Sequence, residues 1–137
     1  MTDTLVDTNI FLDLSGDDHR WADWSQRALA AAIDSGTLVI NQVIYGELGA
    51  GFSALDDLEA ALRDWPFRRE NLPWDAAFLA GQTYVAYRRR GGTRTAPLPD
   101  FFIGAHAATR GYRLLTRDRG IYAAYFPTLD IISPERP

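Results

Sequence analysis

Four acidic residues stand at positions where a folded chain could bring them together: Asp7, Glu47, Asp100 and Asp118. Asp7 and Asp118 each follow a short apolar run, Asp100 comes directly after Pro99, and Glu47 lies in a segment with helical character. Carboxylates gathered in one cleft repel one another and resist desolvation, so chains that gather them usually hold a hard divalent cation. If the four converge, the sequence predicts a metal-dependent enzyme that acts on phosphate esters.

Each acid taken alone also has a purely structural explanation. Asp7 and Asp100 could cap helices, Asp118 could be a turn residue, and Glu47 could be a solvated helix residue. The joint pattern is more informative, because two of the acids follow strands, one opens a helix and one lies on a helix that follows a strand. We therefore treat the four as one candidate site.

The elements that would position these acids alternate along the chain. Short β-like runs are expected at 5–6, 37–40, 67–72, 112–116 and 129–132. Helices are expected at 9–14, from a cap at Asp17 or Asp18 to about Ser35, and at 42–49, 53–65, 75–90 and 101–110. This alternation predicts an α/β fold with a central, mostly parallel sheet. Ligands of such sheets bind beyond the carboxyl ends of the strands, which is where Asp7 and Asp118 fall.

The charged residues bear on the partner. The net charge is −4, but without the four candidate acids the remaining 14 acidic residues balance 14 basic ones. All 14 basic residues are arginine, and eight of them cluster around the last two acids: Arg88, Arg89, Arg90, Arg94, Arg110, Arg113, Arg117 and Arg119. Arginine binds phosphate bidentately and stacks on bases, so the cluster is compatible with a polyanionic partner despite the negative net charge. A genome biased toward arginine codons would explain the missing lysine but not the clustering.

The composition limits the remaining possibilities. A chain of 137 residues, 47% hydrophobic and 23% charged, fits one globular domain spanning 1–137. It has no cysteine and two histidines, His19 and His106, so neither a thiolate nor a histidine-rich metal centre is available. We expect His106 to be a core or surface residue and not a catalytic base. No signal peptide or membrane-spanning run is apparent, so a cytoplasmic protein is expected.

The stretches around the acids resemble those of the PIN domains, and within them the VapC-type toxins of prokaryotic toxin–antitoxin pairs. They are Leu5-Val6-Asp7-Thr8-Asn9, Glu47-Leu48, Asp100 to Ala107, and Leu114 to Tyr122 with Tyr125-Phe126-Pro127 after it. The resemblance runs from Leu5 to Pro134 and rests on four motifs in order. It implies a PIN-like three-layer α/β/α sandwich in which Asp7, Glu47, Asp100 and Asp118 form the acidic quartet.

The same resemblance implies roles for individual residues. Asp7, Asp100 and Asp118 would ligate Mg²⁺, which Mn²⁺ can replace, and Glu47 would ligate the ion or orient the attacking water. Asn9 and Thr116 would support these acids through hydrogen bonds. Many members carry a further acid shortly after the fourth, where this chain has Gly120.

The activity implied is a metal-dependent endoribonuclease whose products carry 5′-phosphate and 3′-hydroxyl ends. The family also implies a small cognate antitoxin and a homodimer. We expect Arg88, Arg89, Arg90, Arg94, Arg117 and Arg119 to contact RNA.

Other classes remain to be weighed. A phosphoaspartate receiver or a haloacid-dehalogenase-type phosphatase would need a lysine, and the phosphatase also an Asp-x-Asp motif; the chain has no lysine and reads Asp7-Thr8-Asn9. A housekeeping PIN nuclease of RNA maturation and a non-catalytic divalent-metal-binding module stay open as alternatives.

Overall fold

Strands and helices alternate along the protein as its sequence predicts. The computed structural model describes residues 2–15, 19–91 and 98–134. Within these ranges the elements are β1 (Thr4–Val6), α1 (Thr8–Ser15), α2 (His19–Ser35), β2 (Leu38–Ile40), α3 (Gln42–Gly49), α4 (Leu55–Leu62), β3 (Phe67–Arg69), α5 (Trp74–Arg89), α6 (Leu98–Arg110), β4 (Arg113–Leu115), α7 (Gly120–Tyr125) and β5 (Ile131–Ile132).

The strands form one sheet in the order β3-β2-β1-β4-β5, and each neighbouring pair is parallel. β2 is apolar throughout, and β1 and β4 each end in two apolar residues, which suits a parallel sheet that is covered on both faces. β1 pairs with β2 on one side and with β4 on the other, and Val6 stands opposite Leu115. The predicted α/β class with a parallel sheet is confirmed.

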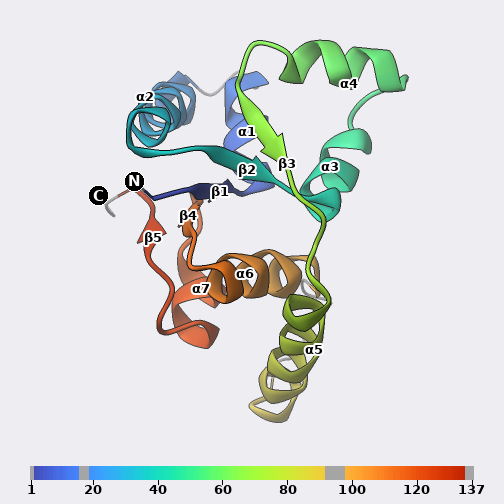
Figure 1. The fold of residues 1–137 in the computed structure, drawn as a ribbon, viewed down its shortest axis with the longest axis vertical. Helices are drawn as coiled ribbons and strands as arrows, with labels where there is room; N and C mark the ends of the chain where they lie inside the picture. Colours follow the sequence, from blue (N-terminus) through green and yellow to red (C-terminus); the bar gives the residue numbers. More distant parts are fainter. Residues whose placement is uncertain (1, 16–18, 92–97, 135–137) are drawn as a thin grey trace.

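Helices cover both faces of the sheet. Figure 1 shows α1 and α2 on one side of the central strands and α6 and α7 on the other, which makes a three-layer α/β/α sandwich. α5 packs against α6 and extends away from the sheet (Figure 1). No helix in the described ranges has both the length and the hydropathy needed to cross a membrane.

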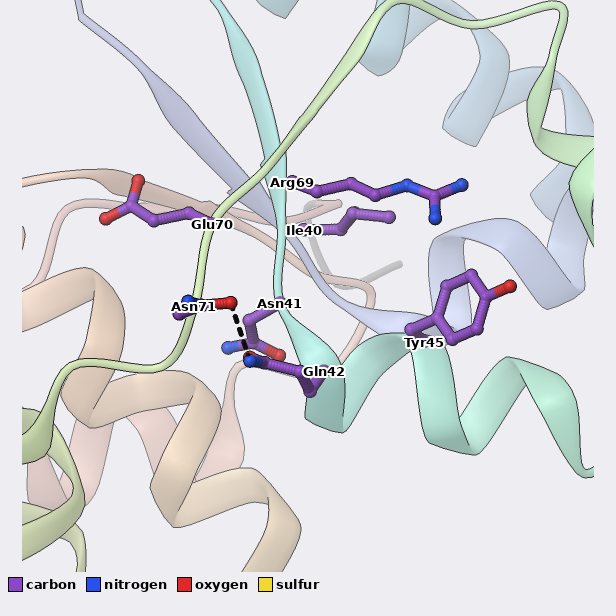
Figure 2. A pocket seen from close by; sticks show the side chains of 7 residues that line it. All are labelled: Ile40, Asn41, Gln42, Tyr45, Arg69, Glu70 and Asn71. Atoms are coloured by element: carbon purple, nitrogen blue, oxygen red, sulfur yellow. Dashed lines mark hydrogen bonds between the residues drawn. The ribbon is translucent and has the colours of Figure 1, made fainter.

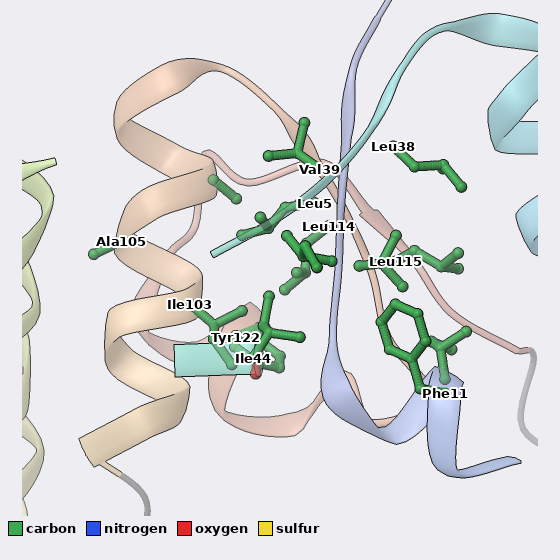
Figure 3. Packing of buried hydrophobic residues seen from close by; sticks show 14 of the residues in the cluster. Leu5, Phe11, Leu38, Val39, Ile44, Ile103, Ala105, Leu114, Leu115 and Tyr122 are labelled. Atoms are coloured by element: carbon green, nitrogen blue, oxygen red, sulfur yellow. The ribbon is translucent and has the colours of Figure 1, made fainter. Parts of the chain in front are cut away.

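The core lies between the sheet and these two helical layers. Leu5 of β1 and Leu114 of β4 are fully buried, and so is Ile103 of α6. Figure 3 shows these side chains clustered together, with Phe11 of α1 on the opposite side of the strands from α6. Burial of this kind is the main favourable contribution to the stability of the fold.

Two details differ from the sequence prediction. α6 begins at Leu98, so Asp100 is a residue of its first turn and not its N-cap. Proline is tolerated in the first turn because the N–H it lacks would have no partner there, so the helix starts before Pro99. The second difference is α7, a six-residue helix that the sequence did not predict. A helix this short contains too few turns for apolar periodicity to reveal it.

Candidate active site

The sheet topology creates a crevice at the ends of β1 and β4. From β1 the chain leads to β2 and β3 on one side, while β4 and β5 lie on the other, so the strand order reverses between β1 and β4. Ligands of open α/β sheets bind at such a switch point. Asp7 directly follows β1, and its backbone N–H donates to the carbonyl of Leu115, the last residue of β4.

The structure brings the four predicted acids together at this crevice. They line one cleft of about 200 Å³ whose lining residues are Asp7, Thr8, Asn9, Leu12, Glu47, Asp100, Asp118, Ile121 and Tyr122. Glu47 comes from α3 and Asp100 from the first turn of α6, so two acids follow strands and two lie on helices.

Asp7 is the best-buried acid of the cleft, with 5% of its surface exposed. Its Oδ1 accepts a 2.7 Å hydrogen bond from the backbone N–H of Thr8. Its Oδ2 accepts hydrogen bonds from the hydroxyls of Thr116 at 2.8 Å and Tyr122 at 3.0 Å. This set of donors holds the carboxylate in one orientation.

Three hydroxyl residues connect Asp7 to the other three acids, one each. Thr8 donates through its side chain to Glu47 Oε1 at 2.7 Å. The Tyr122 hydroxyl lies 3.4 Å from Asp100 Oδ1 as a donor. The Thr116 hydroxyl accepts from the backbone N–H of Asp118 at 3.1 Å. The four acids are therefore coupled through Asp7.

Asn9 braces the same centre. Its side-chain amide donates to Thr116 Oγ1 at 3.2 Å and to Asp7 Oδ2 at 3.4 Å, and its Oδ1 accepts from the backbone N–H of Arg117 at 3.1 Å. Asn9 and Thr116 thus make supporting hydrogen bonds at the positions that the sequence suggested for them.

Each of the other three acids keeps one carboxylate oxygen without a hydrogen bond from the described residues. Glu47 Oε1, Asp100 Oδ1 and Asp118 Oδ1 are bonded, the last to the backbone N–H of Gly120 at 3.1 Å. Their remaining oxygens are available to an incoming ligand. A carboxylate that is oriented by one oxygen and available through the other suits a metal-binding role.

The electrostatics of the cleft also favour a cation. None of the ion pairs formed among the described residues involves these four acids. Burial raises the pKa of Asp7, and burial together with the charges of Asp7 and Glu47 raises the pKa of Asp100 to about 7. Burial and the charges of Asp7 and Asp100 raise the pKa of Tyr122. The cleft therefore resists the accumulation of negative charge unless a cation offsets it.

The donor set fits a hard divalent cation. All four candidate ligands are carboxylates, which suit magnesium or manganese better than softer metals. Across the described ranges, no three His, Cys, Asp or Glu side chains already stand at the spacing of a ready metal site. Mg²⁺ commonly keeps several of its waters, so its protein ligands need not all contact it directly. Asp7, Asp100 and Asp118 could thus hold it partly through water, with Glu47 beside them.

The predicted RNA-binding arginines have different environments. Arg88 and Arg89 are exposed, and the guanidinium of Arg90 lies over the ring of Tyr125 at 5.5 Å. Arg117 pairs with the buried Asp13 at 3.4 Å and lies over Trp21 at 5.1 Å. Arg119 donates to Ser133 Oγ at 3.0 Å.

The three arginines at the end of α5 are thus exposed, as is Arg119, whereas Arg117 is half-buried. Arg94 lies outside the described residues. The end of α5 is also close to the acids, because Tyr87 of α5 contacts Phe101, the neighbour of Asp100, with ring centroids 5.4 Å apart.

A second pocket, at the ends of β2 and β3, has different chemistry. It has a volume of about 210 Å³ and is lined by Ile40, Asn41, Gln42, Tyr45, Arg69, Glu70 and Asn71 (Figure 2). Its one acid, Glu70, accepts from Tyr112 at 2.6 Å and contacts His106 at 3.3 Å. His106 is fully buried and also bonds Asn41 at 2.9 Å, so it is a core residue away from the acids, as expected.

Two residues of the acidic cleft were missed by sequence reasoning, Thr8 and Tyr122. Both stand inside stretches that the resemblance had singled out, directly after the first acid and four residues after the last. A hydroxyl beside an acidic motif was the available signal for Thr8. Tyr122 gave no such signal, because a tyrosine in an apolar segment is typical of a core position.

Comparison with known proteins agrees with this architecture. The family model of the PIN domain matches residues 4–127. A search of curated proteins finds no match. Among solved structures, VapBC2 from Rickettsia felis, bound to a DNA fragment from its promoter, has a TM-score of 0.76 at 17% identity and covers 97% of this chain and 99% of that chain.

Two further structures are similar. A toxin–antitoxin complex from Klebsiella pneumoniae has a TM-score of 0.71 at 23% identity, covering 98% of this chain and 99% of that chain. VapC20 from Mycobacterium tuberculosis, a sarcin–ricin-loop-cleaving toxin, has a TM-score of 0.68 at 18% identity, covering 96% and 99%. At these identities the structures show a shared fold, whereas the family model spans most of the sequence: the chain belongs to the PIN domain family.

Proposed function

We propose that this protein is a Mg²⁺- or Mn²⁺-dependent endoribonuclease and the toxin of a VapBC-like toxin–antitoxin pair. The observation that carries the proposal is the coupled set of four acids at the switch point, which no basic side chain of the described residues neutralises. Membership of the PIN domain family supports a nuclease, and the similar toxin–antitoxin structures support the toxin role.

The residues of the cleft would divide the work of phosphodiester hydrolysis. A divalent cation bound there would lower the pKa of a water molecule and offset charge on the scissile phosphate. Asp7, Asp100 and Asp118 would hold the cation, while Glu47, exposed and oriented by Thr8, would orient the attacking water. Attack by water at phosphorus with departure of the 3′ oxygen would leave 5′-phosphate and 3′-hydroxyl ends.

The arginines at the end of α5 would hold the substrate. Arg88, Arg89 and Arg90 are exposed, and Arg90 lies over Tyr125, whose ring contacts Phe101 next to Asp100. A phosphate backbone bound to these guanidinium groups would therefore run next to the acidic cleft. The similar VapC20 is described as cleaving the sarcin–ricin loop, and we extend RNA cleavage, though not that target, to this chain.

The antitoxin would occupy an apolar groove next to the acids. The groove is lined entirely by apolar side chains of α1, α3, α4 and the segments after α3 and α4, and Leu12 lines both this groove and the acidic cleft. A segment with apolar residues along the groove could reach the acids with a basic side chain, which would compete with the cation.

A homodimer would use the outer face of α5. Trp74 and Phe78 are 92% and 71% exposed, and Val85 continues the same helical face. Large aromatic side chains in such a patch favour protein contacts. Replacing Trp74 and Phe78 with Ser should convert the dimer to a monomer in light scattering, and a monomeric wild type would refute this part.

The central test is cleavage of RNA by Asp100→Asn and Glu47→Gln. Both changes keep the shape of the side chain but remove a charge, so cleavage in Mg²⁺ should fall by at least about 100-fold while the far-UV CD spectrum is retained. A matched control is Asp75→Asn, which changes an exposed acid on α5. Undiminished cleavage by both site variants would refute the nuclease assignment of the cleft.

The two alternatives make different predictions. A non-catalytic metal-binding module would bind Mn²⁺ without cleaving RNA. A housekeeping nuclease would cleave RNA without arresting growth and without a small protein that co-purifies. Cleavage, metal binding and growth measured together therefore separate the three possibilities.

A further inference from the structure

Tyr122 is the one residue of the acidic cleft whose side chain belongs mainly to the core. It is 2% exposed and part of the main hydrophobic cluster. Figure 3 shows its ring among the apolar side chains beside Ile103 and Ile44. Its hydroxyl points from this apolar cluster toward the cleft and lies 3.0 Å from Asp7 Oδ2 and 3.4 Å from Asp100 Oδ1.

The position of this hydroxyl is set by how closely α7 packs against α6. A Cβ atom at Gly104 of α6 would lie 2.5 Å from the ring of Phe126, the residue that follows α7. Glycine is therefore required for this approach. The other end of α7 is held by the bond from the Gly120 N–H to Asp118. The packing of α7 against α6 thus places Tyr122 beside Asp100.

A rigidly held hydroxyl has a specific effect on the two acids that it touches. Asp7 comes from the end of β1 and Asp100 from α6, and no other described residue donates hydrogen bonds to both. The single phenol proton lies closer to Asp7, at 3.0 Å, and is shared with Asp100 at 3.4 Å, so this neutral group links the two carboxylates without an ion pair that would neutralise them. An arginine at this place would instead occupy the oxygens that a cation needs.

We propose that Tyr122 is a positioning residue of the acidic cleft, whose hydroxyl orients the carboxylates of Asp7 and Asp100 toward each other so that one divalent cation can engage both. This inference rests on the proposed metal-dependent function. It assigns to the phenol a role in metal affinity, whereas a core tyrosine would contribute to stability alone.

The test compares Tyr122→Phe with Tyr125→Phe. Both changes remove one oxygen from a ring of the same region, but the Tyr125 ring contacts Tyr87 and Phe101, and no described acid accepts from its hydroxyl. Binding of Mn²⁺ to each protein is measured without RNA, by electron paramagnetic resonance. RNA affinity is measured separately in EDTA.

Tyr122→Phe should weaken Mn²⁺ binding by about 10-fold or more, the usual effect of removing a group that orients metal ligands. Tyr125→Phe should bind Mn²⁺ as the wild type does, and RNA affinity in EDTA should be unchanged in both. In cleavage assays, Tyr122→Phe should need a higher Mg²⁺ concentration for half-maximal rate. Circular dichroism and melting in EDTA establish that both variants are folded at the assay temperature.

Equal Mn²⁺ affinity of Tyr122→Phe and the wild type would overturn the inference, as would an equal loss in both variants. A wild-type protein that binds no Mn²⁺ would overturn the metal-dependent function itself. The two failures are therefore distinguishable.

Discussion

Thr8 donates a 2.7 Å hydrogen bond from its hydroxyl to Oε1 of Glu47, a residue 39 positions further along the chain. The backbone N–H of Thr8 also donates to Asp7, so one residue orients two acids from different elements. Thr8 is nearly buried, whereas Glu47 is exposed. An exposed glutamate without such a bond would sample many rotamers.

Thr8→Val should therefore reduce RNA cleavage more than stability. Valine keeps the shape of the side chain, so the free energy of unfolding should fall by only about 1 kcal/mol. The cleavage rate should fall by about 10-fold, since the orientation of Glu47 is lost. Thr83→Val is the matched control, because among the described residues the Thr83 hydroxyl bonds only the carbonyl of Leu79 within α5. Equal rates in Thr8→Val and the wild type would contradict this role.

Asp100 should make the metal-free protein less stable as the pH rises. Its pKa is about 7 in the folded protein, against an ordinary value of 3.8, so the folded state binds more protons between these pH values. Stability from this group is present below about pH 4 and is lost as the pH rises toward 7. In EDTA, the melting temperature of Asp100→Asn minus that of the wild type should increase between pH 5 and pH 8. A constant difference would contradict the raised pKa.

Metal should stabilise the folded protein, because a cation relieves repulsion among the four acids. The melting temperature should rise with millimolar Mg²⁺ or Mn²⁺; a ligand at 100 times its Kd adds about 2.7 kcal/mol. The rise should be larger at pH 8 than at pH 6, since protons compete for Asp100 at the lower pH. Asp100→Asn should show a smaller rise, and an equal rise would indicate a nonspecific salt effect.

Replacing Arg88, Arg89 and Arg90 together with Gln should weaken RNA binding and flatten its dependence on salt. A protein that neutralises fewer phosphates releases fewer counterions, so the slope should fall by about 0.7 for each phosphate of single-stranded RNA that the variant no longer binds. A variant with Arg27 and Arg63 replaced by Gln tests the effect of charge elsewhere on the surface. The α5 arginines are not involved if both variants keep the wild-type slope.

Expression of the wild-type chain alone should arrest growth, because an exposed nuclease site would cut cellular RNA. Asp100→Asn should be harmless, and co-expression of the small protein encoded next to it should restore growth. Replacing Phe52 in the apolar groove with Glu should weaken binding of that protein but leave RNA cleavage intact. A harmless wild type without a co-purifying partner would favour the maturation nuclease.

Much of this arrangement could be predicted because strand ends are visible in the sequence. The apolar runs before Asp7 and after Tyr112 locate β1 and β4, and parallel strands place their carboxyl ends at one edge. Asn9 and Thr116 were assigned from the resemblance to PIN domains, and each lies within two residues of an acid.

The rest depends on packing that no local pattern encodes. Tyr122 reaches Asp7 and Asp100 because α7 packs against α6. No periodicity in the sequence reveals that these two helices are neighbours. The start of α6 was misplaced because the proline before Asp100 is compatible with both a loop and a first helical turn. The arginine cluster was visible, but the pairing of Arg117 with Asp13 joins residues far apart in the sequence.

The central position of β1 has a consequence for the order in which the protein folds. One neighbour, β2, is made soon after β1, but the other, β4, is made only when the chain has reached Leu115. Until then Asp7 lacks its bonds to Thr116 and Tyr122, although three of the four acids have already been synthesised. Contacts of such long sequence separation form late and slowly. The four acids can thus come together only in an almost complete chain.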